Sequence, residues 1–163
     1  MKLWLLRHGE AEPKARTDAE RNLTGKGRVE VERAATYLQE QPLQAILASP
    51  YQRAQQTAEI IRQALGFAGP VETVPWLTPE TDPADALLYL DRRTEQDILL
   101  VTHQPFVGVF GGWLIGGHRN APLPMATASL AELDGDYLAA GLMRLIALRH
   151  AEQSLPSSEQ SST

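Results

Sequence analysis

His8 and His103 are the residues of this chain whose positions most clearly suggest chemistry, because each ends a run of apolar residues. Arg7 directly precedes the first histidine, and Gly9 directly follows it. Arginine offers a planar pair of donors to phosphate oxygens, and glycine allows the backbone to approach a ligand closely. A histidine between two such residues is well placed to attack phosphorus as a nucleophile.

The apolar runs before the two histidines, residues 3–6 and 98–101, predict strands buried on both faces of a parallel sheet. Open α/β sheets bind ligands beyond the carboxyl ends of their strands, so we expect both imidazoles to face one crevice. A third apolar run, residues 45–48, predicts a further buried strand that ends at the same edge of the sheet.

A helix is predicted directly after this third strand. Ser49 suits the cap position and Pro50 suits the first helical position. Arg53 then falls in the first turn of the helix, where backbone amides attract anions. Three strand ends therefore bring together Arg7, His8, Arg53 and His103, which predicts a pocket for a dianion with one histidine as the nucleophile.

The remaining sequence alternates between helix and strand signals. Further predicted elements are a helix over 24–38 capped by Thr24, a strand over 71–77, a helix over 82–92 capped by Asp82, a glycine-broken helix over 105–115, and a hairpin of 126–130 with 142–148. We therefore expect a three-layer α/β/α sandwich, with a mostly parallel central sheet and a C-terminal antiparallel hairpin. Residues 1–152 should form one domain, and the polar residues 153–163 a disordered tail.

Composition excludes several classes of site and partner. The chain of 163 residues contains no cysteine, which rules out disulfides, thiolate chemistry and cysteine-based zinc sites. Its formal charge of −5 argues against nonspecific nucleic-acid binding. The amino-terminal residues do not resemble a signal peptide, and the apolar residues 106–115 are too few to span a bilayer. We expect a cytoplasmic monomer that binds neither nucleic acid nor membrane.

Four segments carry a resemblance to a known family. Residues 6–11 (LRHGEA) resemble the RHG signature of the histidine phosphatase (phosphoglycerate-mutase-like) superfamily, and residues 23–27 (LTGKG) resemble its helix entry. Residues 48–58 (ASPYQRAQQTA) and 101–103 (VTH) are similar to its two remaining motifs, in the same order along the chain. The short length makes the chain look more like the SixA-type protein phosphohistidine phosphatases than like the larger mutases.

The resemblance implies a mechanism. His8 would accept the phosphoryl group covalently and water would then hydrolyse it, while Arg7, Arg53 and His103 hold the equatorial oxygens. No metal and no cofactor would be required. The implied substrate is phosphohistidine on a partner protein, such as a histidine-containing phosphotransfer domain. An open pocket, with little sequence available for a lid, would suit such a protein-borne substrate.

The general acid is the open point of this interpretation. Asp18, Glu80 and Asp82 are candidates, and Asp82 is better explained as a helix cap. Asp18 and Arg21 are equally compatible with an ion pair and with a place in the substrate pocket. Imidazole, with a pKa of roughly 6.5, leaves far more readily than an alkoxide, so a weak acid or solvent would suffice.

Two alternative functions remain on the same fold. The chain could be a small-molecule phosphomonoesterase, which would turn over a sugar phosphate or a nucleotide efficiently. It could also be a non-catalytic module in which His8 contacts phosphate without attacking it. Trapping a phosphorylated His8 separates the second alternative from an enzyme.

Overall fold

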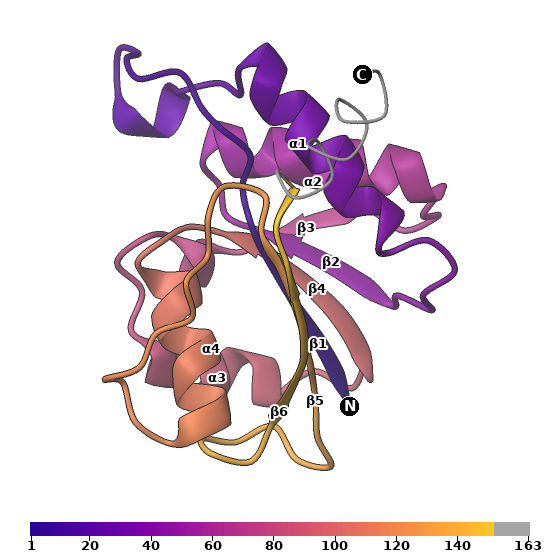
Figure 1. Cartoon of the computed structure of the whole chain (residues 1–163), viewed down its shortest axis with the longest axis vertical. Coiled ribbons are helices and arrows are strands. Elements are labelled where there is room, and N and C mark those ends of the chain that lie inside the picture. Colours follow the sequence, from indigo (N-terminus) through magenta and orange to yellow (C-terminus); the bar gives the residue numbers. More distant parts are fainter. Residues whose placement is uncertain (152–163) are drawn as a thin grey trace, which may run out of the picture.

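A computed structural model describes residues 1–151 of the chain (Figure 1). Its strands are β1 (Lys2–Arg7), β2 (Ala45–Ala48), β3 (Val71–Thr73), β4 (Asp97–Thr102), β5 (Leu130–Asp134) and β6 (Arg144–Arg149). Its α-helices are α1 (Gly25–Thr36), α2 (Gln52–Leu65), α3 (Pro83–Asp91) and α4 (Phe106–Gly116). Two short 3₁₀ turns cover Asp18–Glu20 and Pro75–Leu77. The predicted tail, residues 153–163, lies outside the described residues.

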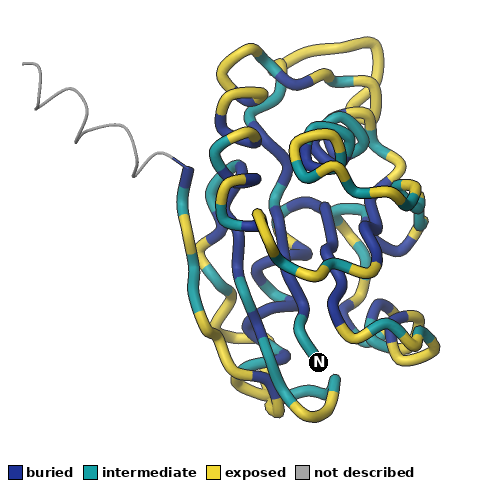
Figure 2. The backbone as a smooth tube through the Cα atoms, turned by 90° about the vertical axis from the view of Figure 1, so that its right-hand side faces the viewer, coloured by how far each residue is buried: buried dark blue, intermediate teal, exposed yellow. Residues whose placement is uncertain are grey.

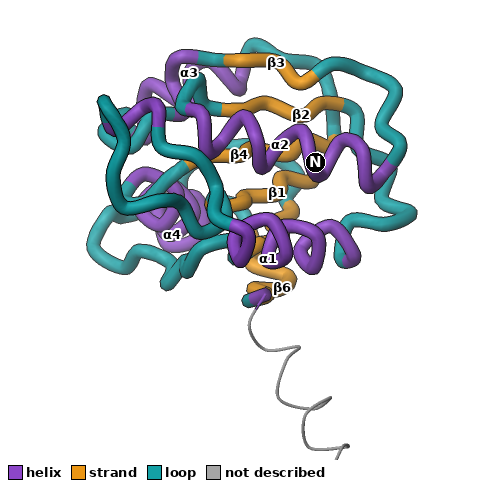
Figure 3. Tube along the Cα trace, turned by 90° about the horizontal axis from the view of Figure 1, so that it is seen from above, coloured by secondary structure: helices purple, strands orange, loops and turns teal. Residues whose placement is uncertain are grey.

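The six strands form one sheet in the order β3-β2-β4-β1-β5-β6, part of which Figure 3 shows from above. The first four run parallel, β5 pairs antiparallel with β1, and β6 pairs antiparallel with β5. In this register Arg7 lies opposite Thr102, and Ala48 lies opposite Val101. The residues that follow β1, β2 and β4 therefore meet at one edge of the sheet.

Helices cover both faces of the sheet, as the predicted sandwich requires. α1 and α2 pack on one face over Trp4 and Leu6, whereas α3 and α4 pack on the other over Leu3 and Leu5 (Figure 1). Buried residues accordingly run along the central strands in Figure 2. Strands β2 and β4 are buried along their whole length, which explains the apolar runs at residues 45–48 and 98–101. The predicted fold class, including the antiparallel C-terminal pair, is confirmed.

Capping residues near the helix ends predict several helix boundaries correctly. The hydroxyl of Thr24 accepts a hydrogen bond from the backbone N of Gly27 at 2.9 Å, which caps α1. The carboxylate of Asp82 accepts one from the backbone N of Ala84 at 2.8 Å, which caps α3. Gly66 ends α2 in the left-handed conformation, with a φ of 62°.

Several predicted elements begin or end at other residues in the structure. α2 begins at Gln52 after the extended Tyr51, so neither Ser49 nor Pro50 starts it. The strand predicted over 71–77 ends at Thr73, and the chain turns at Pro75, whose ring has no N–H to pair in the sheet. The first hairpin strand begins only at Leu130.

α4 is a continuous helix rather than the broken one expected from its glycines. A side chain at Gly112 would bring its Cβ to 2.2 Å from the carbonyl oxygen of Ala121, and one at Gly108 would come to 2.6 Å from that of Leu123. These glycines therefore make room for the segment that packs against α4, and the packing compensates for their low helix propensity.

Candidate active site

His8 lies directly after β1, where its backbone N donates to the carbonyl of Thr102 at 3.0 Å. Its Nδ1 lies 2.7 Å from the carbonyl oxygen of Gly9. Because a carbonyl can only accept, Nδ1 carries the proton and Nε2 presents a lone pair. The Nε of Arg53 donates to this Nε2 at 3.2 Å. The imidazole is thus oriented by its own backbone, with its nucleophilic nitrogen beside a cation.

The electrostatic surroundings keep His8 neutral. The pKa of His8 is lowered to about 4, chiefly by burial and in addition by the nearby charges of Arg53 and Arg7, while the hydrogen bond to Gly9 acts in the opposite direction. At neutral pH the lone pair on Nε2 is therefore available without removal of a proton.

His103 follows β4 and is buried beside His8, with the two ring centroids 5.0 Å apart in an edge-on arrangement. Its Nε2 lies 2.7 Å from the hydroxyl of Ser49. The ring of Tyr51 packs against it, also edge-on, with a centroid distance of 4.9 Å. Burial lowers the pKa of His103 to about 2, with further contributions from His8 and Arg53. His103 is therefore a neutral, positioned partner of His8.

The two arginines approach the histidines from different elements. Arg53, in the first turn of α2, donates from Nη1 to the carbonyl of Asp18 at 2.7 Å and from Nη2 to its carboxylate at 3.2 Å. Arg7 ends β1 and donates from Nη1 to the carbonyl of Met125 at 2.9 Å. Burial and the charge of Arg53 lower the pKa of Arg7. The positive charges of Arg7 and Arg53 lie close together and therefore favour the binding of an anion beside the two histidines.

Two buried donors or acceptors at this site have no partner. Among residues 1–151, the buried side-chain nitrogen and oxygen atoms without a hydrogen bond are Nε of Arg7 and Nδ1 of His103. Leaving such an atom unpaired typically costs about 1–3 kcal/mol, so each is expected to have a partner in the working state. Both atoms belong to the predicted phosphate pocket. Oxygens of a bound phosphoryl group would supply the missing partners.

A buried carboxylate supports the loop that carries His8. Glu30 of α1 accepts from the backbone N of Glu10 at 2.9 Å and from the hydroxyl of Thr127 at 3.1 Å. The loop beyond Thr127 is tied to the site as well, since the backbone N of Ala128 lies 3.0 Å from the carbonyl oxygens of both Arg7 and His8. Sequence reasoning missed Glu30. Its position four residues before Ala34 of the apolar face was the available signal.

The close approach predicted at Gly9 is made to the protein itself. A Cβ at Gly9 would come to 2.6 Å from the carbonyl oxygen of Gly27, in the first turn of α1. The backbone N of Gly9 also donates to the hydroxyl of Thr57 at 3.2 Å. The glycine therefore serves to seat the histidine loop against α1 and α2.

The structure separates the three candidate acids. Asp18 and Arg21 form an ion pair with a distance of 2.9 Å, and Asp18 additionally reaches Arg53. Asp82 is engaged as the cap of α3 and pairs with Arg119 at 2.9 Å. Glu80 lines a surface cavity of about 530 Å³ that Trp76, Asp82 and Tyr89 also line. Of the three, Asp18 alone forms an ion pair with a residue of the histidine and arginine cluster, namely Arg53.

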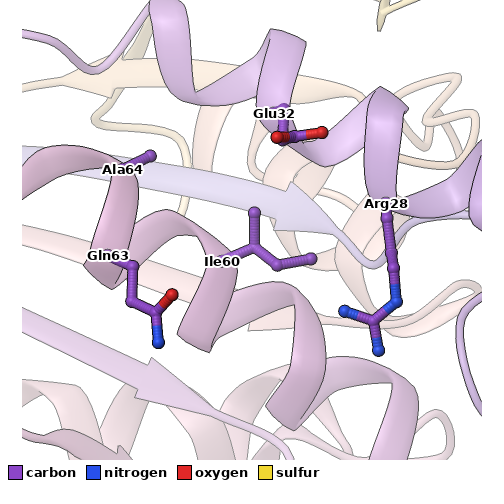
Figure 4. Close-up of a pocket in the computed structure, with 5 residues that line it drawn as sticks. All are labelled: Arg28, Glu32, Ile60, Gln63 and Ala64. Carbon is purple, nitrogen blue, oxygen red and sulfur yellow. The ribbon is translucent and has the colours of Figure 1, made fainter.

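A second hollow, of about 390 Å³, lies between α1 and α2 (Figure 4). It is lined by Arg28, Glu32, Ile60, Gln63 and Ala64. None of the predicted site residues contributes to it.

Residues 1–151 contain neither a metal-binding cluster nor a membrane-spanning helix. This part of the chain has no group of three or more His, Cys, Asp or Glu side chains placed to hold a metal ion. It also has no helix that is both long and apolar enough to cross a membrane.

Comparison with known proteins identifies the family. Residues 3–78 match the histidine phosphatase superfamily (branch 1). Phosphohistidine phosphatase SixA of Escherichia coli is 31% identical over 141 residues, which are 83% of this chain and 86% of that protein. The chain belongs to the histidine phosphatase superfamily. A SixA homolog of Haemophilus influenzae is 30% identical to this histidine phosphatase over 145 residues, covering 82% of this chain and 87% of the homolog.

A solved structure agrees with the architecture of this histidine phosphatase. The protein histidine phosphatase SixA, in complex with tungstate, superposes with a TM-score of 0.85 at 28% identity, covering 94% of this chain and 99% of that one. The resemblance inferred from the four sequence motifs is confirmed, and so is the expectation of a phosphatase.

Proposed function

We propose that this histidine phosphatase removes the phosphoryl group from phosphohistidine on a partner protein, through a covalent phosphorylated His8. The observation that carries the proposal is the lone pair on Nε2 of His8, held beside Arg53. The unpartnered nitrogens of Arg7 and His103 supply the phosphate contacts. The names of the two curated relatives support phosphohistidine as the substrate, and the tungstate complex supports binding of a tetrahedral oxyanion.

In the first step Nε2 of His8 attacks phosphorus. A bond forms between Nε2 and phosphorus, the bond from phosphorus to the substrate imidazole breaks, and its electron pair stays on the leaving nitrogen. His8 becomes a phosphorylated imidazolium, and the carbonyl of Gly9 stabilises it by accepting from Nδ1. Arg7, Arg53 and His103 bind the equatorial oxygens, over which the charge spreads.

In the second step water attacks the phosphorylated His8. The new bond from oxygen to phosphorus forms as the bond to Nε2 breaks, and the electron pair returns to Nε2. Inorganic phosphate leaves, and the surplus proton passes to solvent. The low affinity of neutral His8 for a proton favours this return, because burial disfavours the charged form of the ring.

The proposed substrate also fits the absence of a committed general acid. Asp82 is occupied as a helix cap, and the hydrogen bond from Arg21 lowers the pKa of Asp18, which holds that carboxyl in its ionised form. A phosphate ester needs a proton on its leaving oxygen, whereas an imidazole of pKa roughly 6.5 leaves easily. The partner class we propose is a histidine-containing phosphotransfer domain.

The test compares kcat/KM for a phosphohistidine protein with the values for sugar phosphates, nucleotides, and phosphoserine or phosphotyrosine peptides. We expect the phosphohistidine protein to be preferred, and His8→Ala to abolish turnover with retention of the fold. His118→Ala is the matched control, because His118 lies on an exposed loop. Preference for any phosphate ester would refute the substrate and support a small-molecule phosphatase. Retained activity in His8→Ala would refute the nucleophile.

A further inference from the structure

Asp18 lies on the solvent-exposed side of Arg53. Its side chain is 57% exposed, whereas the side chain of its partner Arg53 is 6% exposed. The loop that carries Asp18 is tied at its base, because the backbone N of Glu12 donates to the carbonyl of Asn22 at 2.8 Å. Arg21 donates to both the carbonyl of Glu12 and the carboxylate of Asp18. The carboxylate is therefore held in place while one side of it remains open to solvent.

Asp18 and His8 share one edge of the Arg53 guanidinium. Nε of Arg53 donates to Nε2 of His8 at 3.2 Å, and Nη2, the other donor of that edge, donates to the carboxylate of Asp18 at 3.2 Å. A phosphoryl group that takes up this edge lies between the nucleophile and the carboxylate. Since phosphoryl transfer places the attacking and leaving atoms roughly in line, the leaving group points towards the side of Asp18.

A bound phosphoryl dianion and the Asp18 carboxylate repel one another. The repulsion is relieved when the leaving group carries a positive charge. Protonated phosphohistidine meets this requirement, because its second ring nitrogen then carries a proton that a carboxylate can accept in a charge-assisted hydrogen bond. Phosphate esters of serine, tyrosine or a sugar have no such cation at the leaving atom.

We propose that Asp18 is a specificity-determining residue that binds the protonated ring nitrogen of phosphohistidine and selects it against phosphate esters. The inference rests on the proposed function and deepens it. When the bond from phosphorus to nitrogen breaks, its electron pair moves onto the imidazolium ring, which leaves as neutral imidazole. The ring keeps its second N–H, so no proton has to be delivered during the step. This role explains why the carboxylate beside the site, that of Asp18, is ionised instead of protonated as a general acid would be.

The test is Asp18→Asn, assayed with a phosphohistidine protein and with an alkyl ester, a phosphoserine peptide, whose leaving oxygen does need a proton. We expect kcat/KM for the phosphohistidine protein to fall roughly 10- to 100-fold, the usual value of a charge-assisted hydrogen bond. The value for the ester should stay constant or rise, and tungstate should bind more tightly, because the repelling charge is gone. Glu20→Gln is the matched control, since Glu20 lies on the same 3₁₀ turn and contacts Arg16 and Thr17.

The outcomes separate this inference from other roles of Asp18 and from the proposed function. Equal loss with both substrates would show that Asp18 only pins the loop, and a larger loss with the ester would show a general acid. Either result overturns the inference while the wild-type preference for phosphohistidine stands. A wild-type preference for the ester overturns the proposed function itself, whatever the variant does.

Discussion

Lowering the pH from about 7 to about 5 should leave His8 able to attack phosphorus, although an ordinary histidine becomes protonated over that interval. The pKa of His8 is lowered to about 4 by burial and by two arginines. At a pH of about 5, a group with that pKa is about 90% neutral, whereas one at about 6.5 is only about 3% neutral. The neutral fraction of His8 should therefore fall by only about a tenth, whereas that of an ordinary histidine falls about 25-fold.

The fold itself should weaken over the same interval. In the unfolded chain both histidines bind protons below a pH of about 6.5, while in the folded chain they resist protonation. Because these pKa values are lowered, the two histidines cost no stability above a pH of about 6.5, and the cost grows as the pH falls to about 4 for His8 and to about 2 for His103. Between pH values of about 6.5 and 5, each histidine should remove about 1.5 kcal/mol from the free energy of unfolding.

Three measurements check this prediction. Urea unfolding at several pH values gives the free energy of unfolding, and kcat/KM is followed over the same range after subtraction of hydrolysis in enzyme-free samples. NMR titration of the imidazole signals, assigned by single substitutions among the four histidines, gives the pKa values directly. A titration midpoint for His8 near about 6.5, or a tenfold loss of kcat/KM per pH unit below it, would show that the described environment does not control the nucleophile.

Three experiments test the roles assigned to His8, Arg53 and Glu30. The trapped intermediate should carry its phosphoryl group on Nε2 of His8, because Nδ1 is held by Gly9; NMR showing phosphorylation of Nδ1 would contradict this tautomer. Arg53→Lys should reduce kcat about 100-fold, since lysine cannot reproduce the two donors of one edge, and near-normal kinetics would remove Arg53 from the site. Glu30→Gln should reduce kcat roughly tenfold by loosening the loop, without weaker tungstate binding. The exposed Glu32→Gln is its control, and equal activities would make Glu30 dispensable.

The strands that form the site were predictable because their burial is uniform. β1 and β4 are covered by helices on both faces, so their central positions, residues 3–6 and 98–101, have to be apolar before the chain reaches His8 and His103. The caps at Thr24 and Asp82 were also predictable, since each depends on residues within three positions. A helix cap depends on neighbouring residues, and a buried strand depends on an apolar run, so a single sequence is enough to predict both.

The start of α2 was not predictable in the same way. Ser49 and Pro50 have the residue types of a helix start, yet the hydroxyl of Ser49 pairs with His103, 54 positions further along the chain. The same hydroxyl accepts from the backbone N of Tyr51 at 3.2 Å, so it joins a local turn to a long-range contact and does not cap α2. Glu30 went unnoticed for a related reason: its partners Glu10 and Thr127 come from loops whose positions depend on the assembled sheet. The sequence therefore predicted the histidines and arginines of the site, but not the residues that position them, such as Ser49 and Glu30.

Gly27 has a consequence for how this family would respond to mutation. A Cβ there would lie 2.1 Å from the carbonyl oxygen of Glu10, so any larger residue must push away the segment that carries His8. That carbonyl also accepts from the backbone N of Thr24 at 3.0 Å, so the loop cannot retreat without uncapping the region where α1 begins. A survey of variants would therefore mark the start of α1 as intolerant, although no side chain of Gly27 exists to meet a substrate. The low tolerance of Gly27 to substitution would then reflect the close packing of its backbone against that of Glu10, and not a role in the reaction.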